Sequence, residues 1–132
     1  MKLGVKRAPV SEAARQKYDA DVTLAGTRPE LLTAAGEAET RFRAAQARRA
    51  PVSELYAAAV DLDDKLTAAM QAAFAAQRAQ IGPRGYDDRI YRRKGMAKPA
   101  VHKLTGEAEH LLTLRETHRL NNIPAEPMEP VV

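Results

Sequence analysis

The sequence contains no cysteine and no tryptophan. Without cysteine the chain can form no disulfide bond and has no thiolate for catalysis or metal binding, as is typical of proteins from reducing compartments. No apolar run approaches the roughly 18 consecutive residues of a membrane-spanning helix. The basic start of the chain, residues 1–7, lacks the apolar segment of a secretory signal. These absences predict a protein that is neither secreted through a signal peptide nor inserted in a membrane.

Large apolar side chains are also scarce. Leu, Ile, Val and Phe contribute 12, 3, 8 and 2 of the 132 residues, slightly less than the roughly 20% below which chains often fail to fold alone. Alanine supplies much of the remaining apolar content, and at about 25 cal/mol per Å² a buried alanine contributes little. A chain of this length holds one domain at most. We therefore expect other protein subunits, including copies of this chain, to cover part of its apolar surface.

Basic residues moderately outnumber acidic residues in the sequence. Lys and Arg number 21 and Asp and Glu number 17, which gives a formal net charge of +4 and an isoelectric point near 9.6. Such a balance indicates a mild attraction to polyanions. Nucleic acid is therefore a candidate partner beside protein.

Two long helices, over about 28–49 and about 53–80, are the clearest elements that the sequence predicts. Thr27 and Glu30 form a capping box before the first helix, and Ser53 is placed to cap the second. Apolar residues recur at spacings of three and four along both. The short proline break between them predicts an antiparallel helical hairpin. The expected helix-packing interface consists of Leu31, Phe42, Leu55, Leu62, Leu66, Met70 and Phe74.

The remaining pattern also predicts helices, and the fold class is therefore all-α. A short helix is expected from Ser11 to Gly26, because serine is a good N-cap and glycine a common helix end. A C-terminal helix is expected over about 105–121. Between the hairpin and this helix, residues 82–103 are expected to form a basic connector that Gly95 and Pro99 interrupt.

The two ends of the chain differ from this single helical domain, which is expected over 11–121. Residues 1–10 are basic and end near a proline, and residues 122–132 hold three prolines. Proline fixes its own φ angle and removes a hydrogen-bond donor. We therefore expect an extended arm at 1–10 and an extended tail at 122–132, both available to bind neighbouring subunits.

One internal similarity links two segments. Residues 7–12 read Arg-Ala-Pro-Val-Ser-Glu, and residues 49–54 read the same. The match indicates either a duplicated helix start or a favourable helix-start sequence that is used twice. It does not predict a solenoid, because repeat arrays need at least three copies.

Residues 84–103 concentrate cations and tyrosines. Lysine and arginine bind phosphates with release of counterions, and tyrosine can stack on bases. The segment is a candidate contact for nucleic acid; the alternatives are a solvated connector and a contact for an acidic protein surface. No signature of a known nucleic-acid-binding module accompanies it. The candidate residues are Arg84, Tyr86, Arg89, Tyr91, Arg92, Arg93, Lys94, Lys98 and Lys103.

Three histidines near the C-terminal end raise the question of a metal site. His102, His110 and His118 recur every eight residues, and Glu107 lies three residues before His110. Di-iron bundles use such a Glu-x-x-His step, but they need a second one and further carboxylates. Residues eight apart are about 80° apart around a helix, so the histidines do not converge. We expect a surface pair of Glu107 and His110, no metal and no cofactor.

A group of aspartates lies in the second long helix, at Asp61, Asp63 and Asp64. Paired carboxylates act as acid and base only in a site that shifts a pKa, and no cleft is predicted here. Asp61 and Lys65 are expected to form a solvated i,i+4 pair. The sequence also lacks a glycine-rich phosphate loop and a nucleophile elbow. We therefore expect neither enzymatic activity nor a small-molecule substrate.

These features favour a non-enzymatic structural or assembly subunit of a large macromolecular complex. Compact alanine-rich helices with extended segments at both ends are the style of small structural proteins of phage-type virions, such as head, connector or tail components. The expected location is accordingly a virion or a cytoplasmic complex. The alternative function is that of a nucleic-acid-binding accessory protein that uses residues 84–103.

Overall fold

The computed structural model describes residues 9–124, and every regular element in that range is helical. The elements are α1 (Glu12–Gly26), α2 (Arg28–Ala47), α3 (Val52–Ile81), the short 3-10 helix η1 (Pro83–Tyr86), α4 (Arg89–Met96) and α5 (Pro99–Asn122). The predicted all-α class, with a helical hairpin and a C-terminal helix, is confirmed. Most of the predicted arm and tail, residues 1–8 and 125–132, lies outside the described residues.

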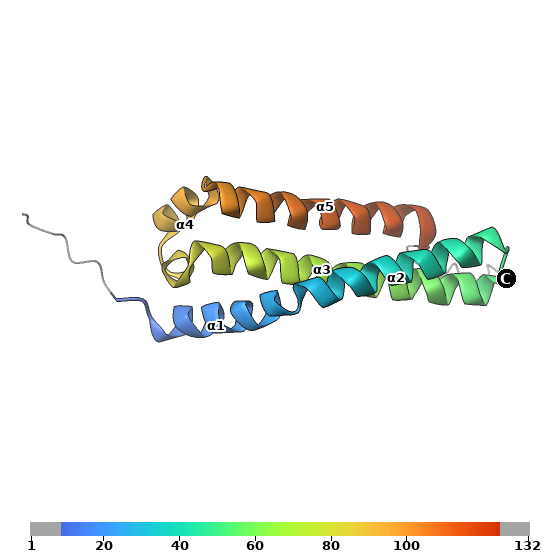
Figure 1. Ribbon diagram of the computed structural model, residues 1–132, viewed down its shortest axis with the longest axis horizontal. Helices are drawn as coiled ribbons and strands as arrows, with labels where there is room; N and C mark the ends of the chain where they lie inside the picture. The colour runs from blue at the N-terminus through green and yellow to red at the C-terminus, as the bar shows by residue number, and fades with distance from the viewer. Residues whose placement is uncertain (1–8, 125–132) are drawn as a thin grey trace, which may run out of the picture.

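Helix α3 is the central element of the molecule. Its 30 residues make it about 45 Å long. Helices α1 and α2 follow each other along one side of α3, and α5 runs along another side (Figure 1). Helices α1, α2 and α5 all run antiparallel to α3. Helix α4 lies at the end of the molecule where the chain turns back from α3 into α5. The result is an elongated bundle with one end formed by η1 and α4.

Helices α1 and α2 are joined by the single residue Thr27. Helix α1 starts as predicted at Glu12, where the Ser11 hydroxyl accepts a backbone hydrogen bond at 3.0 Å, and it ends at Gly26. The predicted capping box is wrong. Thr27 has helical backbone angles, and its hydroxyl donates to the Leu24 carbonyl at 2.6 Å. Because the backbone stays helical through Thr27, its side chain turns back to α1 and does not cap α2.

The turn between α2 and α3 is tighter than the sequence predicts. Arg49 adopts a left-handed conformation (φ 52°), so α2 ends at Ala47 and not at 49. Helix α3 begins at Val52, directly after Pro51, whose fixed φ suits a helix start. Ser53 therefore lies inside α3, and the predicted cap at Ser53 is wrong.

The basic connector predicted over 82–103 is largely helical, which corrects the sequence-based prediction. Gly82 ends α3 as predicted, with a φ of 106° that favours glycine. Asp88 then caps α4 by accepting two backbone hydrogen bonds at 3.0 Å each. Pro99 is the first residue of α5, so the C-terminal helix begins before the predicted residue 105. Proline is tolerated there because the first turn of a helix does not use its N–H groups.

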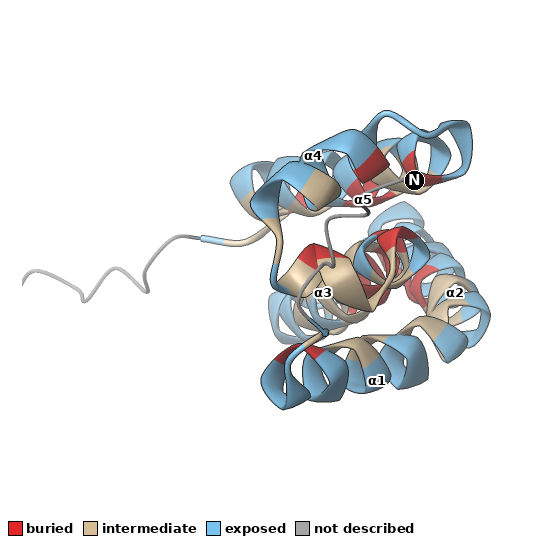
Figure 2. Ribbon diagram, turned by 90° about the vertical axis from the view of Figure 1, so that its left-hand side faces the viewer, coloured by how far each residue is buried: buried red, intermediate tan, exposed pale blue. Residues whose placement is uncertain are grey.

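The core lies between α2, α3 and α5, and alanine supplies much of it. Small residues at the contacts allow helix axes to approach closely. Figure 2 shows the buried residues on the faces that the helices turn toward one another and exposed residues on the outer faces. The core residues are Ala35, Ala38, Phe42, Ala59, Leu62, Leu66, Ala69, Met70, Ala73, Ala108 and Leu111.

The predicted helix-packing interface agrees with this core in most positions. Phe42, Leu62, Leu66 and Met70 are buried. Leu31, Leu55 and Phe74 are half-buried, and Leu31 and Phe74 pack against the core.

Candidate functional site

The residues of the basic segment gather at the end of the molecule formed by η1, α4 and the start of α5. Six of the nine candidates are exposed: Arg89, Arg92, Arg93, Lys94, Lys98 and Lys103. Arg84, Tyr86 and Tyr91 are half-buried. The structure therefore brings the predicted cations together on one end, called the basic end below, where most of them lie on helices and not on a loop.

Tyr86 is engaged within the molecule. Its hydroxyl donates a hydrogen bond to Asp21 of α1. Its ring packs edge-on against Tyr18, with the ring centroids 6.4 Å apart and the planes at 81°. Burial and the hydrogen bond to Asp21 raise the pKa of Tyr86. This tyrosine thus fixes η1 against α1.

Asp21 is the centre of this contact. Arg78 of α3 donates to both of its carboxylate oxygens, from Nε at 2.8 Å and from Nη2 at 3.1 Å. Burial raises the pKa of Asp21, but the hydrogen bonds from Arg78 and Tyr86 outweigh burial, so the pKa lies below its ordinary value of 3.8. One carboxylate therefore holds α1, α3 and η1 in register.

A small cavity opens beside Arg78, with a volume of about 150 Å³. Sequence reasoning included Tyr86 and Arg92 among the candidates but missed Lys17, Arg78 and Asp21. No local pattern marks these three residues, because they come together only when α1 packs against α3. The cavity, named the basic pocket here, is lined by Lys17, Arg78, Ile81, Gly85, Tyr86 and Arg92.

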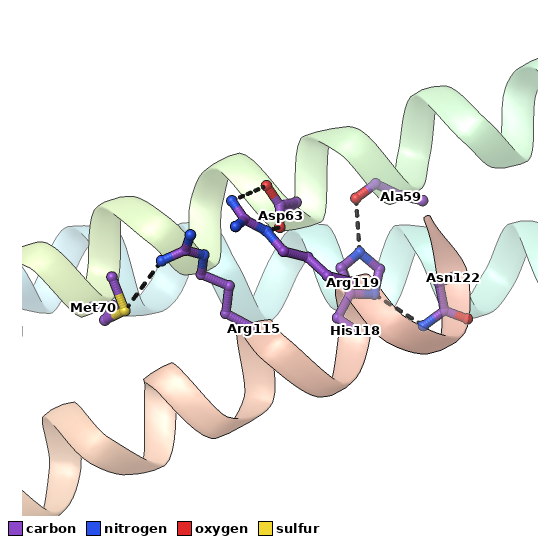
Figure 3. A network of polar contacts seen from close by, with 7 residues as sticks. All are labelled: Ala59, Asp63, Met70, Arg115, His118, Arg119 and Asn122. Atoms are coloured by element: carbon purple, nitrogen blue, oxygen red, sulfur yellow. Dashed lines mark hydrogen bonds and ion pairs between the residues drawn. The ribbon is translucent and has the colours of Figure 1, made fainter. Parts of the chain in front are cut away.

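Toward the opposite end, the buried His118 joins α5 to α3. Its Nε2 lies 2.8 Å from the Ala59 carbonyl oxygen, and its Nδ1 lies 3.0 Å from the amide nitrogen of Asn122 (Figure 3). Because a carbonyl oxygen only accepts, Nε2 carries the proton and Nδ1 accepts from Asn122. The ring also packs edge-on against Phe42 of α2, with centroids 5.3 Å apart. His118 is therefore a core residue shared by three helices.

A pair of arginines next to His118 orients α5 along α3. Arg119 donates to both carboxylate oxygens of Asp63, from Nε at 2.6 Å and from Nη2 at 3.2 Å (Figure 3). Nη1 of Arg115 lies 3.6 Å from the sulfur of Met70. A bidentate arginine–carboxylate pair restricts geometry more than a lysine pair does. Asp63 is thus part of the α3–α5 contact.

The other predicted carboxylate pairs give mixed results. The Asp61–Lys65 pair is confirmed at 3.4 Å, and Arg41 of α2 joins it at 3.0 Å. The hydrogen bond from Arg41, opposed by partial desolvation, holds the pKa of Asp61 below its ordinary value. Both oxygens of Glu107 accept from Arg28 of α2, so the predicted pairing of Glu107 with His110 is wrong. Within residues 9–124, no three His, Asp or Glu side chains are grouped to hold a metal ion.

Apolar side chains are exposed where α3 begins and α5 ends. Val52 is 82% exposed and Leu120 is 84% exposed, and Tyr56 is also largely exposed. Val60, Leu120 and Ile123 line a groove of about 520 Å³ between the two helices. These five residues are called the apolar end below.

Comparison with protein family models, curated proteins and solved structures finds no match to this chain. Over the described range, no helix is both long enough and apolar enough to cross a bilayer. The basic end and the apolar end are therefore the features from which a function is inferred.

Proposed function

We propose that this chain is a non-enzymatic structural or assembly subunit that binds other protein subunits, including copies of itself. The observation that supports this proposal is the apolar end. Val52, Tyr56 and Leu120 expose large apolar side chains on neighbouring helices, although the chain is poor in such residues. Exposed apolar surface of this kind marks interaction sites. Burial of Val52 and Leu120 against another subunit supplies part of the apolar contact that the alanine-rich core lacks.

The test is the self-association of the purified full chain in sedimentation equilibrium. Val52→Ser and Leu120→Ser are each expected to weaken association about tenfold or more, because burial of one such side chain contributes about 1.5–3 kcal/mol. Ile90→Ser is the matched control, since Ile90 is 69% exposed but lies on α4 at the other end. A wild-type chain that stays monomeric and melts cooperatively above about 65 °C, the top of the mesophile range, would contradict the proposal.

The specific assembly that we propose is a phage-type virion, with this chain as a head, connector or tail component. The support is the style of the chain, namely compact alanine-rich helices flanked by proline-containing segments, and this is an argument by analogy. Mass spectrometry of gradient-purified particles from the source of the sequence is expected to find this chain at a constant ratio to the major proteins. Its absence from the particles would overturn the assignment.

A second candidate function is that of a nucleic-acid-binding accessory protein. The observation that favours it is the exposure of Arg89, Arg92, Arg93 and Lys94 on the single short helix α4. Phosphate contacts of such residues make binding fall steeply between low and moderate salt. An apolar subunit interface changes little over the same range, so salt dependence separates the two candidates.

A further inference from the structure

The basic pocket brings together three cationic residues that are distant in the sequence. Lys17 comes from α1, Arg78 from the last turn of α3 and Arg92 from α4. Ile81 and Gly85 complete its wall. Like charges around one cavity repel one another, and a bound anion relieves this repulsion.

The charges of the lining do not cancel within the described part of the chain. Asp21 pairs with Arg78 and so neutralises one of the three cations. Within residues 9–124, Lys17 and Arg92 form no ion pair. The nearby Asp87 does not line the pocket, and its oxygens accept from the backbone N–H and hydroxyl of Ser11 at 2.7 and 2.9 Å. Asp87 nevertheless interacts electrostatically with Lys17, and Arg84 interacts with Asp87 in turn. When these two residues are counted, four cations face two carboxylates, so the pocket and its surroundings remain positive.

Arg78 is held in place before any ligand binds. Asp21 uses its Nε and Nη2 donors, and a guanidinium has five N–H donors in a planar fork. The guanidinium also interacts with Tyr86, and Asp21 leaves the Nη1 donors unused on a side chain whose orientation is already fixed. Tyr86 bonds to the same carboxylate and is braced by Tyr18, so the wall next to Arg78 is fixed as well. A preorganised site loses less entropy on binding.

We infer that the basic pocket is a binding site for a phosphate group. A volume of about 150 Å³ is small beside the roughly 300–1,000 Å³ of typical ligand pockets, so it fits a group and not a whole cofactor. Arginine forks match the geometry of phosphate oxygens, and a lysine adds a third direction of charge. The group belongs either to a nucleic-acid backbone or to a small phosphate monoester. Arg89 and Arg93 extend the positive surface outside the pocket.

The test uses the full chain and two probes at constant ionic strength. Inorganic phosphate is titrated while the backbone amide signals of Gly85 and Tyr86 are followed by NMR, and a labelled single-stranded oligonucleotide is titrated by fluorescence anisotropy. Lys17→Gln and Arg92→Gln each remove a charge-assisted contact and are expected to weaken phosphate binding about tenfold. Both side chains are exposed, so the variants fold as the wild type does. Arg93→Gln is the matched control, because Arg93 lies beside Arg92 but does not line the pocket.

The two sources of the phosphate group give different results. If Lys17→Gln and Arg92→Gln also weaken oligonucleotide binding, the ligand is a nucleic-acid backbone; if they do not, it is a small phosphate monoester. The absence of saturable shifts with phosphate overturns the inference. An equal loss of phosphate affinity in Lys17→Gln and Arg93→Gln also overturns it, because this result would show binding to diffuse surface charge and not to the pocket. Self-association is expected to be the same in all three variants, so this inference fails or holds separately from the proposed assembly function.

Discussion

Leu66 lies in the middle of α3 and is 6% exposed, in the core that α3 shares with α2 and α5. Leu66→Ala is expected to lower the free energy of unfolding by about 2–5 kcal/mol, because the side chain leaves a cavity among neighbours that relax only in part. Asp64→Ala on the exposed face of the same helix is the control, with an expected change within about 0.5 kcal/mol. Urea denaturation of both variants measures the difference. Equal effects would show that the buried face of α3 is misplaced.

Asp21 gives the stability of the chain a specific dependence on pH. Its pKa is lower in the folded chain than in the unfolded one, so the contact stabilises the fold above the ordinary pKa of 3.8. This stabilisation is lost as the pH falls through the folded pKa. The difference in unfolding free energy between the wild type and Asp21→Asn is therefore expected to be largest near neutral pH and to shrink below about pH 4.

Urea denaturation at a series of pH values measures this difference. Tyr86→Phe keeps the Asp21 carboxylate but removes one of its donors, so its pH effect is expected to be smaller than that of Asp21→Asn. A difference between the wild type and Asp21→Asn that stays constant from neutral to acid pH rules out this account.

Single residues differ in how well the sequence predicts their roles. The burial of Leu66 and the exposure of Asp64 follow from the spacing of apolar residues along one helix, which is a local property. No local sequence pattern indicates that His118 is buried. Its partners, Ala59 and Phe42, lie in α3 and α2, and only the packing of three helices shows that a polar ring is satisfied there. A buried polar side chain is predictable only when its partner is known.

At the scale of elements, Gly95 controls how α4 rests on the end of α3. A Cβ atom at Gly95 would lie 2.8 Å from Cγ2 of Ile81, and Ile81 is buried. Gly95→Ala is therefore expected to push α4 away from α3 and to cost about 1–3 kcal/mol of stability. Gly106→Ala is the control on α5, where a Cβ meets nothing within 4 Å, and it is expected to stabilise the chain by up to about 1 kcal/mol.

Thermal unfolding of both glycine variants tests this expectation. Amide hydrogen exchange in α4 adds a local readout, since a displaced helix opens more easily. Two glycine-to-alanine changes with the same sign would show that Gly95 makes no close approach to Ile81.

Whole elements were predictable where local chemistry ends a helix. Gly82 and Pro83 stop α3 because neither continues a helix well, and this reading needs no tertiary information. Helix α4 escaped prediction because it is short and strongly charged, and its one inward-facing buried residue is Gly95. The similar segments 7–12 and 49–54 both lead into helices, but the helices begin at different positions. Helix α1 begins at the last residue of the first segment, and α3 begins at the fourth residue of the second. Local similarity therefore does not fix the point at which a helix begins.

At the scale of the whole molecule, alanine fills much of the core, while several large apolar side chains lie outside it. Ala69, Ala72, Ala73, Ala75 and Ala108 are completely buried, whereas Val52 and Leu120 are more than 80% exposed. Composition predicts the shortage of large core residues. It does not predict where the spare apolar residues gather, because that depends on the ends of α3 and α5 lying side by side. The basic pocket could not be predicted from the sequence for the same reason, since its cations come from three helices.

The two ends of the chain are predicted to serve as tethers to neighbouring subunits. Residues 1–8 and 125–132 lie outside the described residues, and their few large apolar side chains lie among charged residues, glycine and proline (Met1, Leu3, Val5, Met128, Val131 and Val132). Such a pattern provides anchors for another surface and too little apolar area for a core of its own. Deletion of either segment removes no helix from α1 to α5. Ile123 must be kept, because it packs against the core.

We therefore expect that deletion of residues 1–8 or 125–132 leaves helical content nearly unchanged and abolishes incorporation into the parent assembly. Circular dichroism measures the first quantity, and co-purification with the assembled particles measures the second. The competing view is that these segments cap the chain's own helices, and lost helicity in either truncation would support it. Normal incorporation of both truncations would end the tether hypothesis, because the apolar end alone would then be sufficient to hold the subunit in place.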